Sequence, residues 1–384
     1  MSARRVSTKP RRAAPTLREV CDGLERIAPT ALAQSWDNVG LLAGDPNATV
    51  RRAMLCIDLM PAVVTEAISA DVQLIVAYHP PIFKPVGRLL ADSRETDSQV
   101  FDCIAAGIAI YSLHTAYDAA DGGTNDVIAE LCGIDPRTCE PLEFVDQPGE
   151  RSCKLVVFTP ISATERVAEA VSAAGAGIIG QYRRCSFRGA GTGTFEGSDA
   201  TNPAVGRAGV YEKVDEIRLE TIVPHGVLPA VIDALRAAHP YEEPAYDIYP
   251  LDPSPVRGIG RVGRLPRPIT LIALARKLKK AAQAAGVQVV GQKDKLVRRA
   301  VILVGAAGSL PFRVGLGSDD VVITGEIRHH DALTIRRHGA AAVALGHWSS
   351  ERPGLGRLAD RMRDAMPSLD VQLSDADHEP FVAG

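Results

Sequence analysis

The sequence lacks the features that mark a membrane protein or a disulfide-rich protein. Among its 384 residues no apolar run approaches the roughly 20 that cross a bilayer, and the N-terminus has no apolar stretch of signal-peptide type. The seven cysteines form no Cys-X-X-Cys pair, which argues against a disulfide framework and excludes a zinc ribbon. These absences predict a cytoplasmic protein with reduced thiols.

Aromatic residues are scarce at 5%, and positive charge is not in excess, with 43 Lys and Arg against 46 Asp and Glu. The formal net charge of -3 provides no overall field for holding a polyanion, so nucleic acid is not favoured as a partner. A hydrophobic fraction of 46% is typical of an ordinary globular protein. At roughly 100–200 residues per domain, the length predicts two or three domains.

Several familiar catalytic and phosphate-binding motifs are also missing. The sequence contains no Gly-X-Ser-X-Gly, which leaves a serine nucleophile unsupported. The stretch GAAGS at 305–309 could bind a phosphate with its amides, but it lacks the dinucleotide-binding and Walker spacings. We interpret it as a tight turn between a strand and a helix.

The N-terminal residues 1–15 are basic and contain two prolines, which predicts a disordered tail. A helix is expected to follow, because Leu17, Val20 and Leu24 repeat at intervals of three and four residues. Thr16 is placed to cap this helix, with Glu19 three residues further on.

Both ends of the chain alternate short apolar runs with segments of helical length. Continuous apolar runs suit strands buried on both faces, which indicates parallel sheet with helices on each side. We therefore predict an α/β fold in which residues 16–149 and 253–384 form two similar halves of one core domain. The strand candidates are 53–58, 72–77, 108–113, 300–304, 320–324 and 340–345, and the helix candidates are 61–70, 97–106, 124–132, 269–285, 328–338 and 354–365.

The middle of the chain, residues 150–252, follows a different pattern. Two predicted strands alternate apolar and polar residues more than those at the two ends of the chain, and each is followed by an amphipathic helix. The segment 186–214 is rich in Gly, Thr and Ser. This order is typical of a ferredoxin-like α+β domain, which we expect to be inserted into the core. The strand candidates are 153–159 and 215–223, and the helix candidates are 164–174 and 226–238.

Histidines follow three of the predicted core strands directly. His79 comes after 72–77, His114 after 108–113 and His347 after 340–345. Ligands of open parallel sheets bind beyond the carboxyl ends of strands, where such side chains converge. Asp118 and Glu351 each lie four residues after a histidine, so a helical turn would point both members of each pair the same way.

Imidazole and carboxylate groups are the ligand set of Zn, Mn, Fe or Ni, and a carboxylate can bridge two ions. Simpler interpretations remain open for these residues. A histidine after a strand is more often a hydrogen-bonded loop residue, and Asp118 could merely cap the turn before Gly122. Other strands end near Asp58 and Glu326, to which the pattern assigns no role.

Four motifs in order make the chain recognisable from about residue 16 onward. They are SWDNVGLLAG (35–44), AYHPPIFKP (77–85), SLHTAYDAADGGTND (112–126) and GHWSSE (346–351). Together they resemble the NGG-interacting-factor-three-like family, whose bacterial members are often labelled GTP cyclohydrolase 1 type 2. The central segment is similar to the PII/CutA-like insert of the longer bacterial members.

The resemblance implies two divalent metal ions per subunit, of unknown identity among Zn, Mn, Fe and Ni, in a toroidal homohexamer. Carried over by motif, His79, Asp118, His347 and Glu351 match family metal ligands, with Glu351 the bridge between the ions. Many bacterial members have His-His-Pro where this chain has Tyr78 before the histidine. A phenol ligates these ions less readily than imidazole, so the second position is expected to be weak, empty, or completed by His114 or water.

The resemblance also implies hydrolysis of GTP, or of another nucleotide or phosphoester, through metal-activated water. His114 or Asp118 could carry protons in such a reaction, and nothing in the sequence chooses between them. The alternative is a protein without turnover: a metal-binding scaffold, chaperone or regulatory hexamer. Neither a membrane nor a nucleic acid is expected as a partner.

Overall fold

The computed structural model describes residues 13–92, 96–145, 152–251 and 257–382. The chain divides into two compact units, Met1–Val145 with Pro255–Gly384 (unit 1) and Asp146–Ser254 (unit 2). Of the predicted tail at 1–15, residues 1–12 lie outside the described residues. Pro15 is bound to the fold, because its carbonyl accepts a hydrogen bond of 2.9 Å from the amide of Val50.

Unit 1 contains two five-stranded sheets of mixed direction. The strand order is β1-β4-β3-β2-β16 in the first sheet and β11-β13-β14-β15-β12 in the second. The first sheet is built from β1 (Gly40–Ala43), β2 (Arg52–Cys56), β3 (Leu74–Ala77), β4 (Ala109–Ser112) and β16 (Asp370–Leu373). The second consists of β11 (Arg261–Thr270), β12 (Gln288–Val290), β13 (Leu296–Ala306), β14 (Asp320–Glu326) and β15 (Ala341–Ala344).

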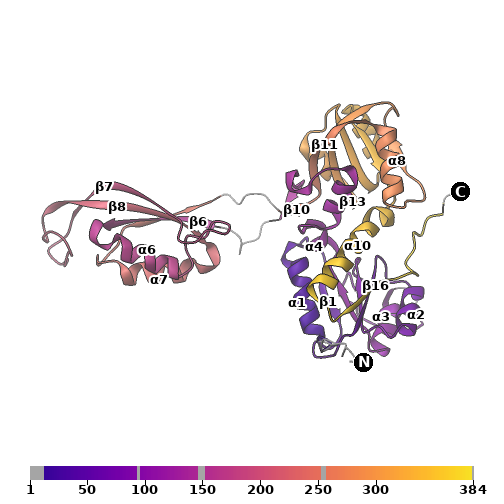
Figure 1. Ribbon diagram of the computed structural model, residues 1–384, viewed down its shortest axis with the longest axis horizontal. Coiled ribbons are helices and arrows are strands. Elements are labelled where there is room, and N and C mark those ends of the chain that lie inside the picture. Colours follow the sequence, from indigo (N-terminus) through magenta and orange to yellow (C-terminus); the bar gives the residue numbers. More distant parts are fainter. Residues whose placement is uncertain (1–12, 93–95, 146–151, 252–256, 383–384) are drawn as a thin grey trace, which may run out of the picture. The chain divides into compact units, whose positions relative to one another are not determined.

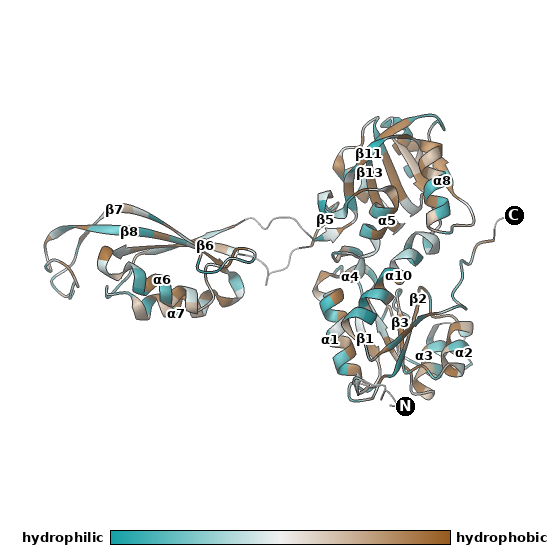
Figure 2. Cartoon of the chain, viewed as in Figure 1, coloured by the Kyte–Doolittle hydropathy of each residue, from teal (hydrophilic) through white to brown (hydrophobic). Residues whose placement is uncertain are grey.

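The apolar runs form buried parallel strands, as predicted. Strands β2, β3 and β4 pair in parallel, as do β13, β14 and β15. Every residue of β3 and β4 is buried, and Figure 2 shows the hydrophobic colour following β13 in the second sheet. Burying one such Leu, Ile or Val side chain contributes about 1.5–3 kcal/mol. The mixed α/β class predicted from the sequence is confirmed.

Helices cover these sheets, and two of them begin at a start signal in the sequence. Thr16 caps α1 through the predicted capping box with Glu19, and Pro61 occupies the first position of α2. Among the described helices, none combines the length and apolar composition needed to cross a membrane. The helices of unit 1 are α1 (Leu17–Ile27), α2 (Pro61–Ser69), α3 (Thr96–Ala105), α4 (His114–Ala119), α5 (Thr124–Cys132), α8 (Leu271–Ala281), α9 (His329–Arg337) and α10 (His347–Ala365).

Helix α10 packs against strands of both sheets and lies between them in Figure 1. A buried ion pair also joins distant segments of unit 1: the Arg261 guanidinium on β11 donates to the Asp126 carboxylate on α5. Arg261 donates further to the carbonyls of Gly258 and Gly260, at 2.7 and 2.8 Å. These bonds satisfy a cation that burial would otherwise make costly.

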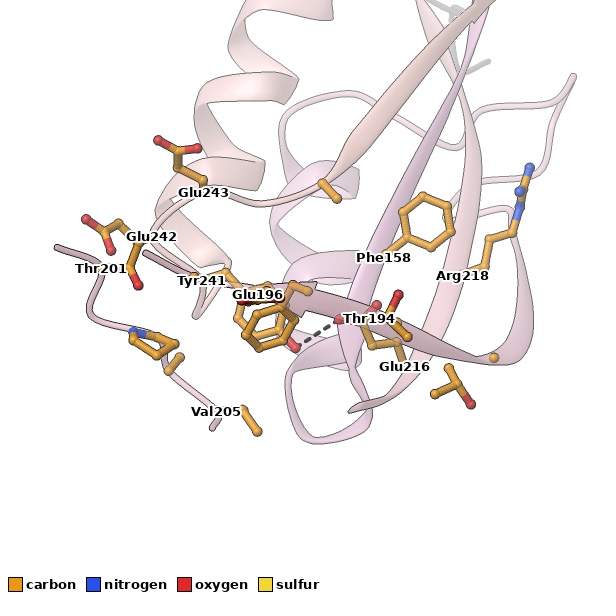
Figure 3. A pocket seen from close by; sticks show the side chains of 18 of the residues that line it. Phe158, Thr194, Glu196, Thr201, Val205, Glu216, Arg218, Tyr241, Glu242 and Glu243 are labelled. Carbon is orange, nitrogen blue, oxygen red and sulfur yellow. Dashed lines mark hydrogen bonds between the residues drawn. The ribbon is translucent and has the colours of Figure 1, made fainter. Parts of the chain in front are cut away.

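Unit 2 forms a four-stranded antiparallel sheet in the order β7-β8-β6-β9, with two helices on one face (Figure 1). Its elements in chain order are β6 (Ser152–Pro160), α6 (Thr164–Ala173), β7 (Ser186–Glu196), β8 (Tyr211–Pro224), α7 (Leu228–Ala238) and β9 (Tyr246–Pro250). A cavity of about 710 Å³ lies within this unit (Figure 3).

Replacing Arg261 with Met would leave the Asp126 carboxylate buried without its counter-charge. We expect this change to lower the free energy of unfolding of unit 1 by about 3–5 kcal/mol, the usual cost of breaking a buried pair. Urea titration followed by tryptophan fluorescence measures unit 1, because Trp36 and Trp348 both belong to it.

Arg137→Ala is the control, because the pair between Arg137 and Asp135 is solvent-exposed. Losing that pair should change the free energy of unfolding by less than about 1 kcal/mol. An equally small change for Arg261→Met would contradict the assigned role of the buried pair.

Candidate metal centre

Three histidines of unit 1 lie just beyond buried strands. His79 follows β3, His114 begins α4 after β4, and His347 begins α10 after β15. His114 has a φ of +28°, which residues other than glycine rarely adopt, so holding it in place costs some backbone strain. The strand ends therefore deliver all three imidazoles to one region of unit 1.

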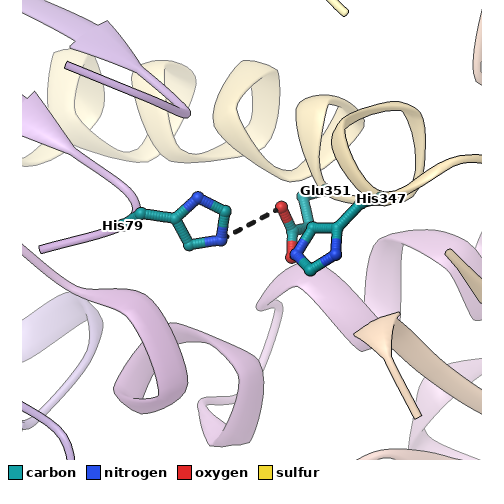
Figure 4. Close-up of side chains that lie close together, drawn as sticks. All are labelled: His79, His347 and Glu351. Carbon is teal, nitrogen blue, oxygen red and sulfur yellow. Dashed lines mark ion pairs between the residues drawn. The ribbon is translucent and has the colours of Figure 1, made fainter. Parts of the chain in front are cut away.

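His79, His347 and Glu351 form a cluster whose ligand atoms all lie within 4.8 Å of one another. His347 and Glu351 stand one turn apart on α10, and their Nε2 and Oε1 atoms are 3.2 Å apart. His79 approaches from the other side, with its Nε2 atom 3.4 Å from Oε2 of Glu351 (Figure 4). The two imidazoles thus face the two oxygens of one carboxylate.

This cluster fits a divalent ion. The Glu351 carboxylate is 4% exposed, yet its Oε2 atom is buried without a hydrogen-bond partner. Two ligands about 2.0–2.1 Å from a tetrahedral zinc ion lie about 3.3 Å apart, close to the separations of 3.2 and 3.4 Å. Two imidazoles and a carboxylate are also a ligand set for Zn, Mn, Fe or Ni.

Gly305, at the end of β13, leaves space for this carboxylate. A Cβ atom at this position would lie 2.5 Å from Oε1 of Glu351 and 3.2 Å from Nε2 of His347. The φ of +61° is a second reason for glycine here. The GAAGS stretch therefore turns away from β13 tightly, as predicted, and it borders the cluster.

Each of the three imidazoles faces a carboxylate with its other nitrogen. The Nδ1 atom of His79 is 2.9 Å from Asp58, that of His114 is 2.8 Å from Asp37, and that of His347 is 3.5 Å from Glu326. Such a partner keeps a proton on Nδ1 and fixes the ring, so that Nε2 is the atom that binds a metal once its own proton is displaced.

The carboxylates around the cluster favour positive charge on it. Burial alone would lower the pKa of His79, but its hydrogen bond to Asp58 and the negative charges of Glu351 and Asp58 raise it to about 10, so a metal ion that binds here displaces a proton from the imidazole. The bond to Glu351 likewise raises the pKa of His347. Burial would raise the pKa of Glu351, yet its two imidazole neighbours keep it below the usual value. The buried carboxylate therefore remains negative and attracts positive charge.

Asp118, the fourth predicted ligand, is not part of the three-residue cluster. Its Oδ1 atom accepts a hydrogen bond from the phenol of Tyr78, and its carbonyl accepts one of 3.0 Å from Asn125. Burial raises the pKa of Asp118 to about 6 and that of Tyr78 well above its usual range. The phenol thus occupies one oxygen of the carboxylate that the family resemblance assigns to a metal ion.

His114 also stands outside the cluster but next to it. Its ring centroid is 5.2 Å from that of His79 and 5.7 Å from that of Tyr78. The Nδ1 atom of His114 is hydrogen-bonded to Asp37, so its Nε2 atom is the one available for a proton or a ligand.

The whole chain matches one protein family. A family model described as Duf34/NIF3 (NGG1p interacting factor 3) matches residues 15–380. The protein belongs to the Duf34/NIF3 family. A relative named GTP cyclohydrolase 1 type 2 homolog in Bacillus subtilis (strain 168) is 35% identical over 367 residues, which cover 93% of this chain and 95% of the relative. A relative of the same name in Mycobacterium tuberculosis (strain ATCC 25618 / H37Rv) is 37% identical over 372 residues, covering 95% and 96%.

Two solved structures share this fold. The crystal structure of a Bacillus cereus protein related to NIF3 is 33% identical and superposes with a TM-score of 0.74, covering 96% of this chain and 99% of that one. Staphylococcus aureus protein SA1388 is 24% identical, with a TM-score of 0.78 and coverage of 96% and 99%. The family resemblance inferred from the four motifs is confirmed.

Sequence reasoning assigned no role to Asp58 and Glu326, although it placed them at strand ends. Their position at the same edge of the sheets as the histidines was the available signal. The pairing itself depends on which strands are neighbours and on side-chain rotamers, which the linear pattern does not contain. The same holds for the hydrogen bond that joins Tyr78 to Asp118.

Asp58→Asn should weaken divalent metal binding about 10- to 100-fold, because the amide no longer fixes the His79 ring as a carboxylate does. Titration of the chelator-treated protein with Zn²⁺ in a calorimeter measures the affinity. Asp360→Asn is the matched control, since Asp360 is 72% exposed and pairs with Arg363 on the surface of α10. Equal affinities for the two variants would contradict the role of Asp58.

Proposed function

We propose that this Duf34/NIF3 protein is a metal-dependent hydrolase that acts on GTP or on another nucleotide or phosphoester. The observation that carries the proposal is the buried Glu351 carboxylate, with one oxygen free of hydrogen bonds and two imidazole Nε2 atoms facing it. The name of the relatives, GTP cyclohydrolase 1 type 2 homolog, suggests the substrate.

His79, His347 and Glu351 would hold the ion. A divalent ion there supplies Lewis acidity, which lowers the pKa of water from 15.7 toward about 7. His114 is the residue best placed to move a proton, because Asp37 orients its ring and leaves Nε2 free. Asp118 is a poorer proton carrier, since Tyr78 already donates to it.

An aromatic surface beside His114 supports a planar substrate. The centroid of the Trp36 ring is 5.9 Å from that of the His114 imidazole and 6.0 Å from that of the Phe83 ring. Trp36 is 58% exposed and Phe83 is 44% exposed, so both rings are available for stacking. A nucleobase is a suitable partner for such a surface.

The metal-loaded protein should release formate from GTP. Glu351→Gln should reduce the release to the background level, because it removes the carboxylate charge between the two imidazoles. Formate is measured enzymatically, and a panel of phosphoesters is assayed alongside. Wild-type protein that releases no more formate than Glu351→Gln, and turns over no phosphoester, would reject the hydrolase proposal.

A second candidate function is a metal-binding scaffold without turnover. The hydrogen bond from Tyr78 to Asp118 favours it, since a dinuclear hydrolase needs both metal positions. Metal binding without turnover in the assay above is the result that this function predicts.

Metal stoichiometry follows from the same hydrogen bond. The wild-type protein should contain about one tightly held ion per chain, and Tyr78→His should raise this to about two by adding an imidazole beside Asp118. Tyr78→Phe, which removes the hydroxyl but adds no ligand, should stay near one. Elemental analysis of protein purified without added metal measures the content, and two ions in the wild type would contradict the effect assigned to Tyr78.

We further propose that the chain assembles as a toroidal homohexamer, as the family resemblance implies. Exposed apolar side chains on or beside neighbouring helices α2 and α3 support an interface there. They are Met60, Ile68, Phe101 and Ile104, each at least 38% exposed. For unit 2, the order β-α-β-β-α-β and the helices on one face support a ferredoxin-like insert.

A further inference from the structure

The cavity of unit 2 lies on the sheet face opposite the helices. Side chains alternate between faces along a strand, and Leu219 and Val223 of β8 pack with the helices. Glu216 and Arg218 of β8 therefore point to the other face, where the cavity of about 710 Å³ opens (Figure 3). This volume is in the range of small-molecule sites.

Between Gly189 and Gly193 of β7 the floor of this cavity carries no side chains. Gly189 and Gly191 lie opposite Arg218 and Glu216 in the sheet register, and Gly193 follows on the same face. Glycine weakens a strand, and one reason to find it there is that another group approaches the backbone closely. A Cβ atom added at Gly191 would meet nothing within 4 Å, whereas one at Gly193 would overlap the Glu216 carboxylate.

Glu216 is a buried carboxylate without a cation. It is 8% exposed, and its Oε1 atom accepts a hydrogen bond of 2.9 Å from the phenol of Tyr241. Among the described residues no Lys, Arg or His forms an ion pair with it. Arg218, on the same face of the sheet, pairs with Glu220 instead, at 2.7 Å. A buried charge is costly unless it is paired, so this carboxylate lacks a counter-charge.

The walls are aromatic and the remaining charges of the lining are mostly negative. Phe158, Phe195 and Tyr241 contribute rings, and Arg218 stacks over Phe158 at 5.8 Å from its centroid. Glu196, Glu242 and Glu243 contribute exposed carboxylates to the lining. Aromatic faces and carboxylates together attract organic cations rather than anions or neutral polar molecules.

We propose that this cavity binds a small organic cation, namely an amine, amidine or guanidine attached to an apolar or aromatic body. The cationic group pairs with Glu216, the body lies on the glycine floor, and the rings of Phe158, Phe195 and Tyr241 flank it. The site belongs to unit 2 alone and is independent of the metal centre and of any hydrolase activity.

Three probes of the same shape and different charge test the proposal on the full-length protein: benzamidine, benzamide and benzoate. Saturable binding of benzamidine, measured by calorimetry, should exceed that of the other two by about tenfold or more, as expected for a bond to a charged group. Glu216→Gln, which keeps an acceptor for Tyr241, should lower the affinity for benzamidine by a similar factor.

Gly191→Val fills the floor without a clash and raises strand propensity, so it should abolish binding while the protein stays folded. Glu169 lies on α6 and forms a solvent-exposed ion pair with Arg184, so the variant Glu169→Gln should bind benzamidine like the wild type. Glu351→Gln should also bind normally, which separates this site from the metal centre. Failure of benzamidine to bind, equal affinity for benzamide, or unchanged binding by Glu216→Gln would overturn the proposal.

Discussion

The Glu351 carboxylate is buried between two imidazoles, and the arrangement of unit 1 depends on this contact. A buried charge must be compensated, and here the compensation comes from His79 on the first sheet and His347 on the same helix. Helix α10 contacts strands of both sheets, so the carboxylate reaches His79 only when both are in place. The buried pair between Arg261 and Asp126 likewise joins residues far apart in the sequence, on β11 and α5. The candidate metal centre is therefore assembled from segments that only the folded unit 1 brings together.

Around this carboxylate the site is asymmetric. On one side, the Nδ1 atoms of His79 and His347 face the carboxylates of Asp58 and Glu326, so their Nε2 atoms point toward the position of a metal ion. On the other side, the phenol of Tyr78 donates to Asp118 and occupies the group that would complete a second position. This asymmetry is the basis of the proposal that one ion is held firmly and that His114 moves the proton.

Much of the fold could be predicted from local sequence signals. The apolar runs became buried parallel strands, Thr16 capped its helix with Glu19, and the helix predicted at 124–132 has the same bounds as α5. The last strand, β16, returns to the first sheet and pairs with β2. The local sequence does not predict this pairing, because it depends on contacts between the two ends of the chain. The stretch 186–214, rich in Gly, Thr and Ser, contained no strand candidate, yet β7 occupies its first part, since cross-strand pairing with β8 outweighs the low strand propensity of glycine.

The candidate site was predictable to the extent that strand ends determine it. His79 and His114 converge because the parallel strands β3 and β4 end at one edge of the first sheet. His347 follows β15 of the second sheet and reaches them on α10, which contacts strands of both sheets, and its spacing from Glu351 suits one helical turn. Three features depend instead on side-chain packing between segments far apart in the sequence. They are the carboxylates that face the histidine Nδ1 atoms, the hydrogen bond from Tyr78 to Asp118, and the Glu216 carboxylate of unit 2 without a counter-charge. A single sequence does not contain that information.

Anomalous diffraction from crystals of the protein soaked with Zn²⁺ would show which side chains hold the ion. We expect a strong peak bonded to Nε2 of His79, Nε2 of His347 and the carboxylate of Glu351. A peak bonded through Nδ1, a peak elsewhere in unit 1 only, or none between these three side chains would contradict it.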